Sequence, residues 1–154
     1  MDMDDLLQWC DRNGLHLSEM VLKATAYIDN FRLSFNYYSK ERKGGAANIM
    51  SGSDFLETNA RTYGLLYEID NKTREIIRKK EGFPDHYGEI VVCAQTTGGI
   101  TFKAMTYKVQ EKREYESHQK PTDYYMNLII SNARKNHFPQ DYVSFLENIV
   151  RQVK

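Results

Sequence analysis

Apolar and polar residues alternate at strand spacing in the first half of the chain. Within residues 24–38, the apolar residues Phe31, Leu33 and Phe35 are separated by single polar residues. This period of two is typical of a strand with one buried face. The same criteria, with a glycine-rich hairpin turn at residues 97–99, predict further strands at residues 44–49, 62–69, 88–95 and 100–109.

The remaining apolar residues recur at helical spacing. Residues 4–10 predict a short helix, and a second helix is predicted from Thr122 onward. Pro139 suits the first position of a last helix, whose apolar stripe is formed by Tyr142, Phe145, Leu146, Ile149 and Val150. Strands, one helix between them, a hairpin and two final helices predict a single α+β domain over residues 1–154, with mostly antiparallel pairing.

The helix between the strands ends on an unusual carboxylate. Asp70 is a good N-cap and Gly82 a good left-handed C-terminal residue, and Pro84 prevents the helix from resuming. Glu81 then lies at the negative end of the helix dipole, where a carboxylate is disfavoured and becomes a better proton acceptor. A solvated surface glutamate is the alternative interpretation of this residue from the stretch alone, and His86 nearby is interpreted as a surface histidine.

Composition excludes several classes of function. Lys and Arg number 21, as do Asp and Glu, so the formal net charge is zero and no basic face indicates a nucleic-acid partner. No apolar run reaches the length of a membrane span, and the acidic residues 1–5 do not resemble a signal peptide. Cys10 and Cys93 are interpreted as small core residues, since they form neither a disulfide framework nor a metal-ligand cluster. These features predict a cytoplasmic protein without a metal site.

The motifs of the chain, taken in order, resemble those of the γ-glutamylcyclotransferase-like (AIG2-like) family. The resemblance covers nearly all of residues 1–150 and implies a mixed, mostly antiparallel β-barrel with flanking helices. The motifs that carry it are Gly44-Gly45-Ala46, Gly64-Leu65-Leu66-Tyr67, Glu81-Gly82 with Tyr87, Tyr107, Pro121-Thr122-Asp123-Tyr124-Tyr125 and His137-Phe138-Pro139-Gln140-Asp141-Tyr142.

The chain also departs from the family pattern. Members begin with a strand that ends in a Tyr-Gly-Ser-Asn loop, and Met1 falls at the position that follows this loop. Relative to the family, the sequence is therefore interpreted either as an N-terminally truncated member or as one whose start is assigned too late. Arg78 also stands where members often have Asp. An edge left unpaired by the missing strand predicts self-association.

The family resemblance implies a specific reaction. Its characterised members release 5-oxoproline from γ-glutamyl compounds, as the substrate's own α-amine attacks its γ-carbonyl. Glu81 would accept the amine proton and return it to the leaving group, with no metal or cofactor. Gly44, Gly45 and Ala46 would let the backbone approach the small-molecule γ-glutamyl substrate, and Tyr87 and Tyr107 would line its pocket.

Two functions remain open from the sequence. The first is a γ-glutamylcyclotransferase-like enzyme, favoured by Glu81-Gly82. The second is a non-catalytic module that binds a small molecule or a protein on the same fold, favoured by the missing loop. Plain strand geometry remains an equal alternative for the three small residues, and core packing remains an alternative for each tyrosine.

Overall fold

A computed structural model describes residues 3–51 and 60–152 of the chain. The first elements are α1 (Met3–Arg12), β1 (Met20–Asp29), β2 (Phe31–Ser39), β3 (Gly44–Ser51) and β4 (Arg61–Ile69). They are followed by α2 (Asn71–Glu81), β5 (Tyr87–Thr96), β6 (Thr101–Val109), the short 3₁₀ helix η2 (Glu111–Arg113), α3 (Asp123–Lys135) and α4 (Gln140–Gln152). No helix in the described ranges has both the length and the apolar character needed to span a bilayer.

The strands form two antiparallel sheets. One sheet has the order β4-β1-β5-β6, and the other consists of β2 and β3 alone. The α+β class and the antiparallel pairing are confirmed. The closed β-barrel is not, because no ladder joins the two sheets among the described strands. Where β3 meets β6, the Val109 N–H donates to the side-chain Oδ1 of Asn48 (2.9 Å) instead of to a backbone carbonyl.

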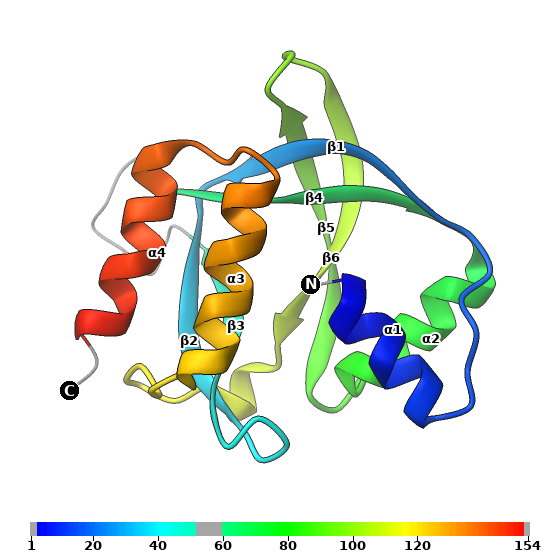
Figure 1. The fold of residues 1–154 in the computed structure, drawn as a ribbon, viewed down its shortest axis with the longest axis horizontal. Helices are drawn as coiled ribbons and strands as arrows, with labels where there is room; N and C mark the ends of the chain where they lie inside the picture. Colours follow the sequence, from blue (N-terminus) through cyan, green and yellow to red (C-terminus); the bar gives the residue numbers. More distant parts are fainter. Residues whose placement is uncertain (1–2, 52–59, 153–154) are drawn as a thin grey trace.

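The helices cover two separate regions of the sheets. Figure 1 shows α3 and α4 side by side, next to the β2–β3 sheet, and α1 with α2 at the opposite side of the molecule. Phe35 of β2 and Met126 of α3 lie in the core beneath the first pair, and Leu6 and Cys10 of α1 pack on Ile76 of α2. The space between the two helix pairs is where the candidate site lies.

The predicted helix ends are confirmed at α2 and α3. The Asp70 side chain accepts a hydrogen bond from the Thr73 N–H (2.8 Å), and Gly82 adopts φ 65°. Thr122 caps α3 through its bond with the Tyr125 N–H (3.3 Å). Short-range chemistry decides each of these ends, which explains why the sequence predicts them.

One strand boundary is wrong in the sequence-based prediction. The stretch 24–38 belongs to two strands in different sheets, β1 and β2, separated by Asn30 with φ 63°. Asparagine tolerates this left-handed conformation better than most residues. The consecutive polar residues Asp29 and Asn30 interrupt the alternation at this turn, a signal that the prediction of a single strand did not use. The polar residues 51–59 predict a loop, and most of them lie outside the described residues.

The two cysteines differ in their environments. Cys10 is buried, as predicted, but Cys93 on β5 is exposed. Cys93 pairs across the sheet with Lys103 of β6, and neighbouring side chains on this face include the exposed Val91. The prediction that Cys93 is a core residue is therefore wrong, because this face of the β5–β6 hairpin is not covered.

Candidate active site

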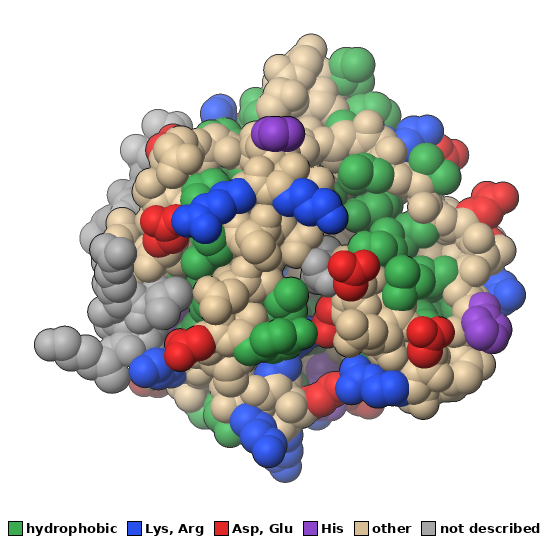
Figure 2. Space-filling view, viewed as in Figure 1, with side chains coloured by type: hydrophobic (Ala, Val, Ile, Leu, Met, Phe, Trp, Pro, Cys, Tyr) green, Lys and Arg blue, Asp and Glu red, His purple; other side chains and the backbone are tan. Residues whose placement is uncertain are grey.

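A wide cavity opens between the two sheets and helices α2 and α3. Its volume is about 2170 Å³, above the roughly 300–1,000 Å³ that is usual for a small-molecule pocket. Figure 2 shows this face hollowed near its centre, with hydrophobic side chains gathered beside the hollow. The cavity is therefore an open trough that a ligand would occupy only in part.

Glu81, the last residue of α2, lies in the wall of this cavity. Its side chain is half-buried, and burial raises the pKa of its carboxyl group, while the positive charges of Lys80 and Arg42 oppose that rise. No residue in the described part of the chain donates a hydrogen bond to this carboxylate. A carboxylate with a raised pKa, placed in a cavity, can accept a proton from a bound ligand.

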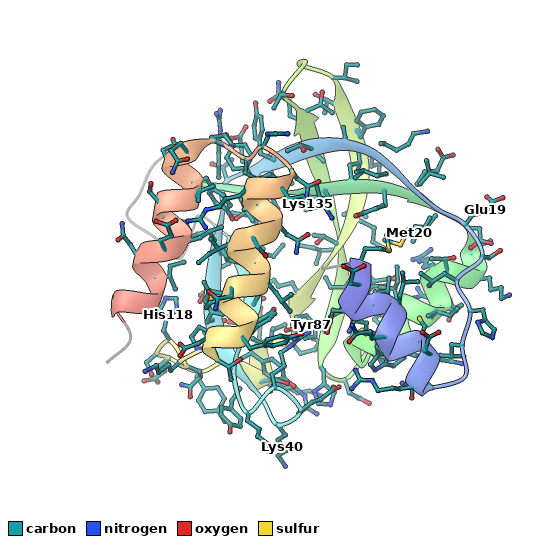
Figure 3. The ribbon with its side chains drawn as sticks, in the orientation of Figure 1. Glu19, Met20, Lys40, Tyr87, His118 and Lys135 are labelled. Atoms are coloured by element: carbon teal, nitrogen blue, oxygen red, sulfur yellow. The ribbon has the colours of Figure 1, made fainter. Side chains whose placement is uncertain are left out.

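Two tyrosines beside Glu81 bind the same residue of β3. The Tyr87 hydroxyl donates to the carbonyl oxygen of Ala47 (2.9 Å), and the Ala47 N–H points to the Tyr125 hydroxyl oxygen (3.4 Å). Burial raises the pKa of both phenols. Figure 3 shows Tyr87 in the space between α3 and α1. Both tyrosines line the cavity, and their hydroxyl groups fix the β3 backbone as its wall.

Tyr107 of β6 is held by a cluster of charged residues. Its hydroxyl donates to Glu89 Oε1 (3.0 Å), and Glu89 also accepts hydrogen bonds from Arg74 (2.7 Å) and Arg78 (2.6 Å). Hydrogen bonds from Arg78 and Arg74 hold the pKa of Glu89 well below its usual range. Arg78, which departs from the family pattern, therefore helps to orient a cavity residue through Glu89.

Gly44 and Gly45 meet another part of the backbone. The Gly45 N–H donates to the Lys120 carbonyl oxygen (2.8 Å), and a Cβ on Gly45 would lie 2.0 Å from the Gln119 carbonyl oxygen. A Cβ on Gly44 would lie 2.9 Å from the Lys120 carbonyl oxygen. Both glycines are thus required for the close approach of the segment that leads into α3.

The structure brings four of the six predicted site residues to one cavity. Glu81, Ala46, Tyr87 and Tyr107 line it, whereas the backbone at Gly44 and Gly45 packs against the 119–122 segment. The role of each residue toward a substrate stays a prediction. In the described ranges, no group of three or more His, Cys, Asp or Glu side chains is placed to hold a metal ion.

Several cavity residues were not predicted from the sequence. His86 is half-buried and its Nδ1 lies 2.5 Å from the Tyr37 hydroxyl, so its interpretation as a surface histidine is wrong. Arg42 also lines the cavity, from a turn whose charged sequence gave no signal of an inward side chain. Tyr125, which the sequence provides only as part of a family motif, adds its hydroxyl to the cavity wall.

The sequence comparison identifies the family. Residues 61–146, more than half of the chain, match the AIG2-like family. The chain belongs to the AIG2-like family, which confirms the resemblance drawn from its motifs. A search of curated proteins returned no match.

Solved structures show the same fold. A structure titled "Gamma-glutamyl cyclotransferase" aligns with a TM-score of 0.73 and 22% identity over 89% of this chain and 79% of its own. An uncharacterized protein from Homo sapiens aligns with a TM-score of 0.74 and 22% identity over 93% of this chain and 81% of its own. At this identity the likeness establishes the shared fold.

Proposed function

We propose that the protein is a γ-glutamylcyclotransferase-like enzyme that releases 5-oxoproline and an amine from a γ-glutamyl amine or peptide. The observation that carries the proposal is the Glu81 carboxyl group, which lies in the cavity wall with a raised pKa. Membership of the AIG2-like family and the fold shared with a structure titled "Gamma-glutamyl cyclotransferase" support it.

The reaction needs one proton carrier. The α-ammonium group of the substrate gives a proton to Glu81, and the resulting amine attacks the γ-carbonyl carbon. The new C–N bond closes a five-membered ring and forms a tetrahedral intermediate. Glu81 returns its proton to the leaving nitrogen as the original amide bond breaks. The ring nitrogen then releases its second proton to water, and the departing amine takes up a proton from water to become an ammonium ion. Nucleophile and electrophile belong to one molecule, so no covalent enzyme intermediate forms.

The surroundings of Glu81 suit this role. Burial disfavours the charged carboxylate and makes it a stronger base than a solvated glutamate. The positive charges of Lys80 and Arg42 act in the opposite direction and favour the ionised form that accepts the proton. Tyr87, Tyr125 and Ala46 supply a fixed wall against which the ring can close.

Substrate scope tests the proposal. The purified protein should release 5-oxoproline from a γ-glutamyl dipeptide or amine, measured by mass spectrometry. The N-acetylated γ-glutamyl compound and the α-glutamyl isomer should give none, since the first lacks a nucleophilic amine and the second cannot form this ring. Release from the N-acetyl compound would contradict the mechanism.

A second candidate is a non-catalytic binding module on the same fold. The large open volume of the cavity favours it, because a wide trough excludes water poorly. This alternative predicts saturable binding of a γ-glutamyl compound, seen by calorimetry, with no 5-oxoproline over many hours. Turnover that depends on Glu81 would eliminate it.

A further inference from the structure

Arg42 is a cation that enters the cavity from the turn between β2 and β3. It is the half-buried residue of the turn 40–43, whose other three residues are exposed. Figure 3 shows Lys40 of this turn at the outer edge of the molecule. The Arg42 guanidinium instead lies 4.2 Å from the centroid of the Tyr125 ring, in the cavity wall.

The Arg42 side chain is held in place by two contacts, which leave several of its N–H donors without an acceptor among the described residues. Its Nη2 donates to Asp5 Oδ2 of α1 (3.2 Å), and Asp5 also accepts from Lys80 (3.0 Å). A guanidinium carries five N–H donors, and no further acceptor for them lies among the residues that the structure describes. The Tyr125 ring fixes the plane of the group, so the remaining N–H groups are available to a ligand.

Arg42 is also electrostatically coupled to Glu81. Its charge and that of Lys80 both act against the burial that raises the pKa of Glu81. Lys80 also lines the cavity and donates to the same Asp5 oxygen, but its Nζ lies 5.7 Å from the centroid of the Trp9 ring of α1. Of these two cations, Arg42 is the one that lies beside Tyr125 in the cavity wall.

We propose that Arg42 binds the α-carboxylate of the γ-glutamyl group and so selects substrates that carry this carboxylate. The inference rests on the proposed function. The α-amine and the α-carboxylate are attached to the same carbon, so a cation near Glu81 meets the carboxylate when Glu81 meets the amine. The planar fork of arginine matches the two oxygens of a carboxylate. Asp5 balances the charge of Arg42 in the absence of substrate.

The test compares two substrates and a matched control variant. One substrate is a γ-glutamyl amide, and the other is its 4-aminobutyryl analogue, which lacks the carboxylate and closes to 2-pyrrolidinone by the same step. Arg42→Met should lower kcat/KM for the γ-glutamyl amide by roughly 10- to 100-fold more than for the 4-aminobutyryl amide, mainly through KM, because any effect of the lost charge on Glu81 is common to both substrates. Arg42→Lys should give a kcat/KM for the γ-glutamyl amide between those of the wild type and Arg42→Met, because lysine keeps the positive charge and lacks the planar guanidinium.

Arg61→Met is the control. Arg61 makes the same two kinds of contact, an ion pair with Asp29 (2.7 Å) and a stacked position 4.4 Å from the centroid of the Tyr27 ring. It lies at the start of β4, at the far end of this strand from α2, and does not line the cavity. The Arg61→Met substitution should leave kcat/KM unchanged for both substrates. If Arg42→Met prefers the γ-glutamyl amide over the 4-aminobutyryl amide as strongly as the wild type does, the inference is overturned.

A binding measurement separates this inference from the proposed function. Calorimetric titration of Glu81→Gln, with and without Arg42→Met, should show that 5-oxoproline binding depends on Arg42. 2-Pyrrolidinone, which lacks the carboxylate, should bind equally to both proteins. Arg42→Lys provides the same comparison if Arg42→Met does not fold. Turnover with no dependence on Arg42 overturns the inference alone, whereas Arg42-dependent binding without turnover supports it and overturns the enzyme.

Discussion

At the scale of single residues, the account depends on how α2 places Glu81. The helix stops at Gly82 because that residue adopts a left-handed conformation, and the last helical side chain therefore reaches the cavity. The sequence predicts this position, because caps and stops are local. It does not predict Arg42, Tyr125 or the Tyr37–His86 pair, because their partners are separated from them by dozens of residues.

The raised pKa of Glu81 predicts how stability depends on pH. The folded protein keeps this proton to a higher pH than the unfolded chain, whose glutamate pKa is about 4.3. The contribution of Glu81 to the free energy of unfolding is therefore fully present below this value and is lost as pH rises through the folded pKa. The glutamine of the Glu81→Gln variant cannot ionise, so the variant does not lose this part of the free energy of unfolding as pH rises.

Urea unfolding at pH 4, 6 and 8 measures this effect. Glu81→Gln should become more stable relative to the wild type as pH rises, because only the wild type must keep a charge in the cavity wall. Asp5 also has a shifted pKa: burial raises it, and Lys80 and Arg42 lower it by more. Asp5 is present in both proteins, so its titration does not contribute to the difference between them. Glu116→Gln, at an exposed position, is the control. A difference between Glu81→Gln and wild type that does not change with pH would contradict the burial of this carboxyl group.

At the scale of elements, Asn48 of β3 joins the two sheets. Its Oδ1 accepts from the N–H groups of Val109 and Ile49, and its Nδ2 donates to Asn36 and Glu114, all within 2.9–3.0 Å. The side chain is 2% exposed. A polar residue in a strand of small and apolar residues is a signal in the sequence, but its partners on β2 and β6 become visible only in the fold.

Asn48→Ala should lower the free energy of unfolding by about 3 kcal/mol, since it leaves buried donors and an acceptor without partners. Chemical denaturation measures the change. Asn127→Ala, at an exposed position of α3, should change stability by less than about 0.5 kcal/mol. Equal effects of the two substitutions would show that Asn48 does not connect the sheets.

At the scale of the whole molecule, two sheets face an open cavity without closing into a barrel. The family resemblance predicted closure, and the strand order β4-β1-β5-β6 with a separate β2–β3 pair does not provide it. Helix and strand identity follow from periodicity in the sequence. The arrangement of the sheets does not, because it depends on which distant edges meet.

Self-association stays a prediction. Among the described strands, β4 and β6 are the edges of the larger sheet, and β2 and β3 pair only with each other. Exposed backbone donors and acceptors at an edge favour pairing with another chain. Light scattering coupled to size-exclusion chromatography should show a molar mass that increases with protein concentration, above the 18.0 kDa of one chain. A constant mass of one chain across a hundredfold range of concentration would contradict this prediction.

The decisive experiment on Glu81 compares the release of 5-oxoproline by wild type and Glu81→Gln at equal concentrations of folded protein. We expect turnover of a γ-glutamyl compound by the wild type and a loss of roughly 100-fold or more in the variant, since a positioned acid–base group contributes about 10²- to 10⁴-fold. Matching circular dichroism spectra would establish that both proteins are folded. Equal turnover by the two proteins would contradict the account.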